Sequence, residues 1–153
     1  MKSTIEILDQ ELMATLKHFT LSDVPKLVDA IEKTSKEDYQ RIVVEIYKGS
    51  RLVFLSAGSK TTFENNLWAK KKHNVVAQYE HSSLYEKAVY KADNKVFFES
   101  SGCSAADYAI VGGGFPINVT TVGFSGVLVI SGLTDEEDHE LAYTALTELK
   151  KTQ

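Results

Sequence analysis

Lys72 is a charged residue at a position where a helical pattern favours an apolar side chain. Between Trp68 and Tyr79 the apolar residues recur at helical spacing, and Lys72 shares their face, four residues after Trp68. One interpretation is a lysine whose stem covers apolar surface while its amine reaches water. The other is a cation in the wall of a pocket or a subunit interface.

Asp138 repeats this pattern with the opposite charge near the C-terminus. It lies four residues before Ala142, on the face expected to be buried, and His139 borders that face. The carboxylate can stabilise the start of its own helix. Alternatively it pairs with Lys72 or orients His139, because a buried charge requires a partner.

Three consecutive glycines precede Phe115 and form a second candidate site. They are not a Walker loop, because no Gly-Lys-Ser/Thr follows, and not a dinucleotide fingerprint, because they open onto a strand pattern. They can form a turn with positive φ, or expose bare amides that let an anion approach closely. From these patterns, the candidate ligand-binding residues are Lys72, Gly112, Gly113, Gly114, Phe115, Asp138 and His139.

Histidine, serine and cysteine contribute no recognisable catalytic or metal motif. The four histidines lack HExxH spacing and no acidic cluster has metal-loop spacing, so we predict no metal-ion site. A single buried histidine is nevertheless able to ligate haem iron. No serine lies in a nucleophile elbow, and the single cysteine, Cys103, excludes an intrachain disulfide.

The elements that position these residues are helices and strands in separate runs. Four Ser or Thr residues have Glu three positions later, the pattern of a capping box at a helix start: Ser3, Thr61, Ser83 and Thr134. We expect helices over about 4–18, 23–33, 62–79, 84–90 and 135–149, and strands over 42–47, 52–57, 108–111, 115–119 and 124–130. The buried face of the first helix is expected to consist of Ile5, Leu8, Leu12, Leu16 and Phe19.

This order of elements predicts one α+β domain over residues 1–153, with an antiparallel sheet of about five strands flanked by helices. Hairpin-length links favour antiparallel pairing. A parallel crossover needs a long connection, and the one stretch of sufficient length, 57–108, is occupied by two helices.

Composition excludes several classes of partner. Lys and Arg total 17 against 21 Asp and Glu, giving a charge of −4, and the only arginines are Arg41 and Arg51, which disfavours nucleic acid. We find no apolar stretch of signal-peptide or membrane-span length. With a single cysteine, these features predict a cytoplasmic protein that does not bind membranes.

Several separated motifs together resemble the signature of an uncharacterised, UPF-type bacterial and fungal family. They extend from about residue 65 to 146, and Ile130 replaces the valine usual in the family. The motifs are Trp68, Lys72, Val75-Val76, Tyr79, His81-Ser82-Ser83, Gly113–Ile117, Gly126-Val127, Val129–Leu133 and Asp138-His139.

That family is grouped with the haem-degrading domain superfamily and is similar to the HbpS, GlcG and PduO C-terminal proteins. The resemblance implies a profilin-like (GlcG-like) fold and a homo-oligomer built from dimers. Some members of the superfamily bind haem and a few are said to degrade it, but the branch resembled here has no settled activity. No haem ligand carries over to a residue of this chain. The resemblance does imply that His81 is a signature position, so His81 joins the candidate ligand-binding residues.

Three hypotheses remain open at this point. The leading one is an oligomeric binding protein with a polar pocket for haem or a small anionic ligand, received by Lys72 and the glycine amides. The second is a haem-degrading enzyme with His81 or His139 near the iron. The third is a structural scaffold without a small-molecule ligand.

Overall fold

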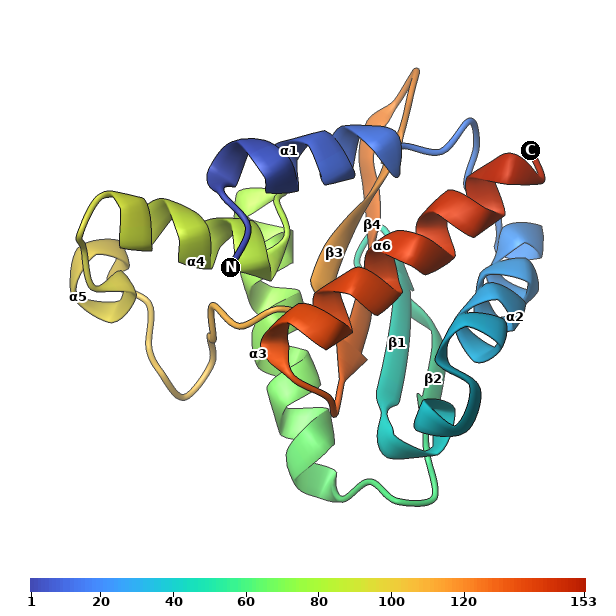
Figure 1. Cartoon of the computed structure of the whole chain (residues 1–153), viewed down its shortest axis with the longest axis horizontal. Helices are drawn as coiled ribbons and strands as arrows, with labels where there is room; N and C mark the ends of the chain where they lie inside the picture. The colour runs from blue at the N-terminus through green and yellow to red at the C-terminus, as the bar shows by residue number, and fades with distance from the viewer.

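The centre of the molecule is a four-stranded antiparallel sheet, seen in a computed structural model that describes residues 1–153 (Figure 1). The strand order is β2-β1-β4-β3, so two hairpins are joined through their inner strands, β1 and β4. The strands are β1 (Val43–Lys48), β2 (Arg51–Ala57), β3 (Gly114–Val119) and β4 (Gly123–Ser131).

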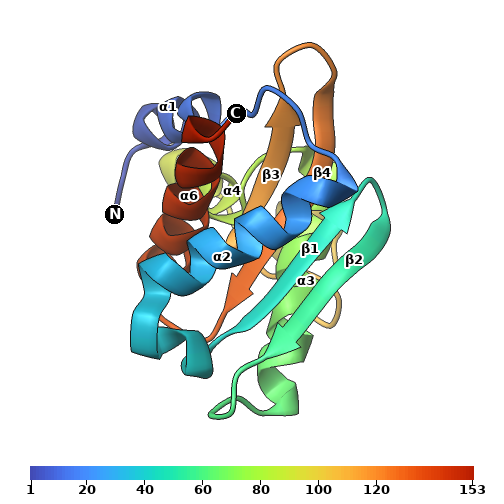
Figure 2. The same cartoon turned by 90° about the vertical axis from the view of Figure 1, so that its right-hand side faces the viewer.

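Helices cover both faces of this sheet. Figure 2 shows α2 and α6 in front of the strands and α3 behind them, while α4 and α5 extend away from the sheet in Figure 1. None of the helices combines the length and the apolar character needed to cross a bilayer. The helices are α1 (Thr4–Met13), α2 (Val24–Ser35), α3 (Phe63–Tyr79), α4 (Ser83–Ala92), α5 (Phe97–Ser101) and α6 (Asp135–Lys151), with 3₁₀ turns at Leu21–Asp23 and Lys36–Arg41.

The two faces of the sheet support two separate cores. In β4, Leu128 and Ile130 point to the α2 and α6 side, whereas Val127 and Val129 point to α3. The sequence of an inner strand that is buried on both faces is a continuous run of apolar residues, rather than an alternation of apolar and polar residues. This explains the unbroken sequence from Val127 to Ile130.

The sheet has four strands, so the expectation of about five is corrected. Residues 108–111 form no strand. The segment that leads into them is held by the side chain of Asn74 on α3, which donates to the Asp107 carbonyl (2.8 Å), and by a turn in which Tyr108 N–H donates to the Ser104 carbonyl. Its path beside α3 keeps it out of the sheet.

Helix α1 differs most from the sequence expectation. It ends at Met13 rather than near residue 18, because the Leu16 backbone pairs with the end of β3, where it bonds to Asn118 and to Thr120 just after the strand. Its orientation is also reversed, since Ile5 and Leu12 are exposed. The side chains it buries are Ile7, Gln10 and Glu11.

The predicted capping boxes fall into two groups. Those at Ser3 and Thr134 are confirmed. The other two helices start one residue away from the expected cap: Thr62 precedes α3, and the Ser82 hydroxyl accepts the Tyr85 N–H at the start of α4.

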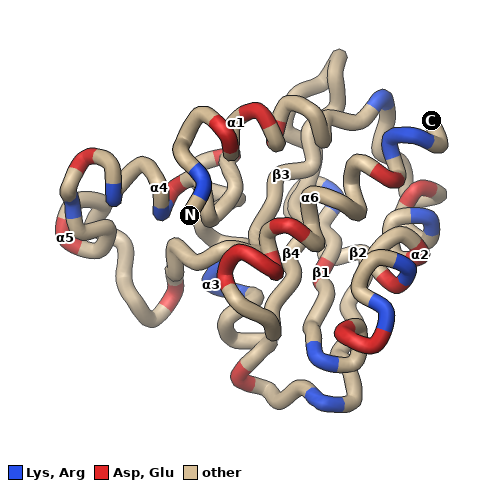
Figure 3. The backbone as a smooth tube through the Cα atoms, viewed as in Figure 1, with Lys and Arg blue, Asp and Glu red and all other residues tan.

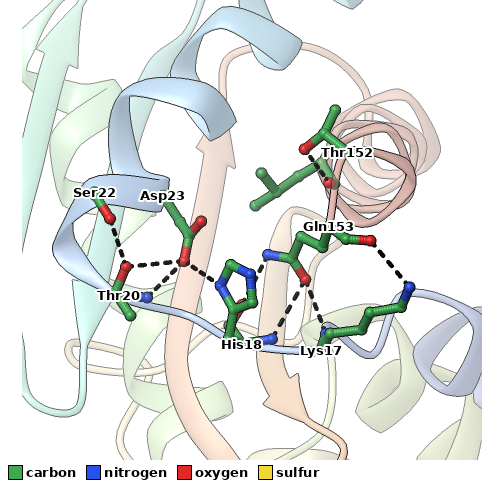
Figure 4. A network of polar contacts seen from close by, with 8 residues as sticks. Lys17, His18, Thr20, Ser22, Asp23, Thr152 and Gln153 are labelled. Atoms are coloured by element: carbon green, nitrogen blue, oxygen red, sulfur yellow. Dashed lines mark hydrogen bonds and ion pairs between the residues drawn. The ribbon is translucent and has the colours of Figure 1, made fainter.

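The C-terminus closes the fold by binding the segment between α1 and α2 (Figure 4). The Gln153 side chain accepts the backbone N–H groups of Lys17 and His18. Asp23 accepts from His18 Nδ1 (2.9 Å) and from the Thr20 N–H (2.7 Å). Burial raises the pKa of Asp23, but these hydrogen bonds outweigh it and hold the pKa below the usual value.

Candidate functional site

Lys72 and Asp138 form a buried ion pair between α3 and α6. The Lys72 amine donates to Asp138 Oδ2 and to the Ile130 carbonyl, each at 3.0 Å. The two side chains are 5% and 1% exposed. The first hypothesis for Lys72, an amine that reaches water, is therefore wrong.

The loop between β4 and α6 completes the coordination of the carboxylate. Asp138 Oδ1 accepts the Leu133 N–H (3.0 Å) and Oδ2 accepts the Gly132 N–H (3.2 Å). Burial raises the pKa of Asp138, while the charge of Lys72 and these hydrogen bonds oppose the rise. The carboxylate thus ties α3, the end of β4 and α6 to one point.

A cavity of about 260 Å³ lies beside this pair. Its walls come from α3, the end of β4, the following loop and the first turn of α6. Lys72 is its only cation, whereas α6 opens with a run of acidic residues visible in Figure 3. The cavity is lined by Asn65, Trp68, Lys72, Val111, Ser131, Gly132, Leu133, Asp135 and Asp138.

The three glycines lie behind the ion pair and do not line the cavity. A Cβ on Gly113 would approach the Lys72 amine to 2.9 Å, and one on Gly114 would approach Val76 Cγ2 to 2.8 Å. Gly112 passes against the Asp135 carbonyl with no room for a side chain. Their first role is therefore close packing of the chain against α3 and α6.

The expectation of bare glycine amides is wrong for Gly114. Its N–H donates to the Ser83 hydroxyl at 3.0 Å, at the start of α4. Phe115 follows directly and is fully buried in the core on the α6 side, where its ring lies 5.2 Å from the His139 ring. None of these groups faces the cavity beside Lys72.

His139 follows Asp138 in sequence but points elsewhere. It is fully buried, and its Nε2 is 2.8 Å from Gln10 Oε1, which leaves Nδ1 without a hydrogen-bond partner. Burial lowers the pKa of His139 to about 4. Its neutral ring therefore belongs to the contact between α6 and α1, and Asp138 does not orient it.

His81 lies after the end of α3 and is 39% exposed. Its Nδ1 is 2.7 Å from Glu11 Oε2, and Glu11 Oε1 accepts the Ser82 N–H at 2.7 Å. The ring also packs against Tyr85, with centroids 4.5 Å apart. A buried carboxylate thus fixes the imidazole, and Nε2 makes no hydrogen bond within the chain.

Sequence reasoning missed the two polar residues of α1 that hold these histidines. Gln10 binds His139 and Glu11 binds His81. Adjacent polar residues between apolar ones look like the solvated side of an amphipathic helix, so no signal in the sequence marks them. No group of three or more His, Cys, Asp or Glu side chains is arranged to hold a metal ion.

Comparison with known proteins identifies the family of this chain. Residues 19–147 match the model of the family described as haem degrading protein HbpS-like, and the chain belongs to it. It is 49% identical to a UPF0303 protein of Lactiplantibacillus plantarum, covering 97% of this chain and 96% of the relative. It is 33% identical to a UPF0303 protein of Psychromonas ingrahamii, covering 96% and 92%. The UPF-type resemblance is therefore confirmed.

Solved structures confirm the fold class. The crystal structure of the Ybr137w protein aligns with a TM-score of 0.88 and 25% identity, covering 98% of this chain and 89% of that one. A complex of PduOC with haem aligns at 0.70 with 18% identity, covering 84% and 92%. HbpS aligns at 0.66 with 16% identity, covering 86% and 90%.

Proposed function

We propose that this chain is a haem-associated binding protein that works as a homo-oligomer and holds a small anionic ligand in the cavity beside Lys72. The observation that carries the proposal is an unused donor. A lysine ammonium has three N–H groups, and Asp138 and the Ile130 carbonyl accept two of them. The third is left for an oxygen acceptor in the cavity.

Size and charge restrict this ligand. Pockets for drug-sized molecules measure about 300–1,000 Å³, and this cavity of about 260 Å³ is smaller. Asp138 neutralises Lys72, and the second carboxylate of the wall, Asp135, is itself paired with Lys87. A monocarboxylate fits this environment better than a multiply charged anion, and the Trp68 ring, which the Lys71 amine covers on one face, adds an aromatic side chain to the wall.

Trp68 makes the small-ligand proposal directly measurable, because it is the only tryptophan of the chain and lines the cavity. Titration with acetate should change its fluorescence in a saturable way. The change should disappear in Lys72→Met/Asp138→Leu, in which both charges are replaced together, and persist in the exposed control Lys70→Met. A saturable response that survives in the double variant would overturn the assignment.

The haem part of the proposal rests on a residue away from this cavity, His81. The cavity is small and no histidine, cysteine, methionine or tyrosine lines it, and His139 is buried. His81 has the required features: one ring nitrogen is held by Glu11 and the other is free, as in histidines that ligate metals. When bound, haem supplies a redox-active iron. His81 would hold that iron, with Glu11 setting the tautomer and orientation of the ring.

Titration of haemin into the purified protein tests the role of His81 as a haem ligand. We expect a sharp Soret band that saturates at one haemin per chain, is lost in His81→Ala and is retained in His18→Gln, a variant of another exposed histidine. A band that is absent from the native protein, or retained in His81→Ala, would overturn this role of His81. Decay of the band after addition of ascorbate would favour a haem-degrading enzyme over a binding protein.

A further inference from the structure

Ser131, the last residue of β4, is a buried polar residue whose side chain has no partner in the fold. It is 2% exposed. Its hydroxyl makes no hydrogen bond within the chain, but it is not sealed in the interior, because Ser131 lines the cavity beside Lys72. Buried hydroxyls in folded proteins almost always have a hydrogen-bond partner. The position of this hydroxyl in a cavity wall points to a polar group of the ligand as its partner.

The buried ion pair fixes the backbone on both sides of Ser131. The Ile130 carbonyl accepts from the Lys72 amine, and the Gly132 N–H donates to the aspartate of the pair. In the sheet Ser131 lies opposite Val43, whose side chain belongs to the core on the α3 side. Directly opposed residues of neighbouring strands point to the same face. The hydroxyl is therefore on the face of the sheet from which Lys72 approaches.

The cavity wall around Ser131 offers hydrogen-bond acceptors as well as donors. The third N–H of Lys72 is a donor, whereas the carboxylates of Asp135 and Asp138 keep lone pairs that their own partners do not fill. Asp135 pairs with Lys87, and Oδ1 of Asp138 accepts a single N–H. A plain carboxylate ligand would use only the donors of this wall. A ligand that also carries an O–H group would use the acceptors too.

We propose that the ligand is a short α-hydroxy carboxylic acid and that Ser131 determines this specificity by binding its hydroxyl group. The inference rests on the proposed function, in which the carboxylate of the ligand binds Lys72. Ser131 directly follows the residue whose carbonyl holds the Lys72 amine, so its hydroxyl meets the ligand close to the carboxylate, at the α-carbon. The serine donates to the ligand hydroxyl, whose own hydrogen is then available to a carboxylate of the wall.

A neutral hydroxyl suits this position better than an ammonium group. An ammonium group on the α-carbon would lie beside the Lys72 cation, and both carboxylates of the wall already pair with lysines, Asp138 with Lys72 and Asp135 with Lys87. Like charges at short distance repel each other, whereas an O–H group forms hydrogen bonds without adding a charge. Of two acids with the same carbon skeleton, lactate should therefore bind more tightly than alanine.

Comparison of lactate, propionate and alanine tests the inference, because the three acids differ only in the group on the α-carbon. The fluorescence of Trp68, which lines the cavity, reports the binding of each acid. The native protein should bind lactate about fivefold more tightly than propionate, the effect of one added hydrogen bond. In Ser131→Ala lactate should lose this advantage, so that the two acids bind about equally. The comparison in the native protein needs no substitution and does not depend on the folding of the variant.

Ser125→Ala is the matched control. Ser125 is on the same strand, donates to the Gly123 carbonyl and does not line the cavity, so this variant should keep the native preference for lactate. Equal binding of lactate and propionate by the native protein, tighter binding of alanine than of lactate, or a preference that survives in Ser131→Ala would overturn the role of Ser131 and leave the carboxylate site in place. A native protein that responds to none of the three acids would overturn the proposed small-ligand function as well.

Discussion

The amine of Lys72 and the carboxylate of Asp138 lie 3.0 Å apart in the interior of the protein, 66 residues apart in sequence. Each charge is neutralised by the other, while the Ile130 carbonyl accepts a second N–H of the amine and the N–H groups of Gly132 and Leu133 donate to the carboxylate. Removal of one partner leaves a buried, uncompensated charge. Removal of both does not.

The first prediction concerns this pair. Lys72→Met should lower the free energy of unfolding by about 3–5 kcal/mol, because Asp138 would stay buried without its cation. Lys72→Met/Asp138→Leu should recover much of that loss. Denaturant titration of both variants measures the difference, with the exposed Lys70→Met expected within about 0.5 kcal/mol of the native protein. Equal stability of the single and double variants would contradict the pairing.

A second prediction compares two glycines, Gly113 in the glycine run and Gly123 outside it, to distinguish the effect of close packing from that of backbone conformation. Gly113 and Gly123 both have positive φ, +128° and +88°, but a Cβ on Gly113 would contact the Ile130 carbonyl, whereas one on Gly123 meets open space. Gly123→Ala should cost about 1 kcal/mol or slightly more for the conformation alone. Gly113→Ala should cost clearly more, because the chain must also move away from the ion pair. Thermal unfolding of the two variants compares them, and equal losses would refute the packing role.

The third prediction is a pH dependence from His139. Its pKa is about 4 in the folded protein against 6.5 ordinarily, so the unfolded chain binds more protons between these values. The His139 contribution is fully present above pH 6.5 and falls by about 3 kcal/mol as the pH drops to 4. Denaturant titrations at several pH values should show this slope, and His139→Gln should flatten it over the same range. An unchanged slope in that variant would assign the effect to other groups.

The secondary structure was largely predictable because its signals are local. The expected helix over 62–79 is confirmed as α3, and the expected start of the last helix at 135 is confirmed, since caps and helical periodicity act over a few residues. The inward positions of Lys72 and Asp138 were visible for the same reason. Periodicity assigns a residue to a face even when its type does not suit that face.

The predictions that were wrong share one cause, which is contacts between residues far apart in the sequence. The expected strand over 108–111 lies beside α3 instead of in the sheet, and the first helix stops at Met13 because Leu16 pairs with β3. The predicted buried face of α1 was wrong. Gln10 and Glu11 are buried instead, because they form hydrogen bonds to histidines far away in the chain. A hydrogen-bond partner 70 or 129 residues distant leaves no mark on the local pattern.

By itself, the sequence determined the α+β class, the family resemblance and the fact that one lysine and one aspartate face inward. The tertiary structure decided that these two meet, that the glycines pack behind them, that His139 is buried while His81 faces solvent, and that Ser131 lines the cavity. The physical reason is range. Helix faces, caps and turns depend on neighbours a few residues apart, whereas ion pairing, burial and cavities depend on which distant segments the folded chain brings together.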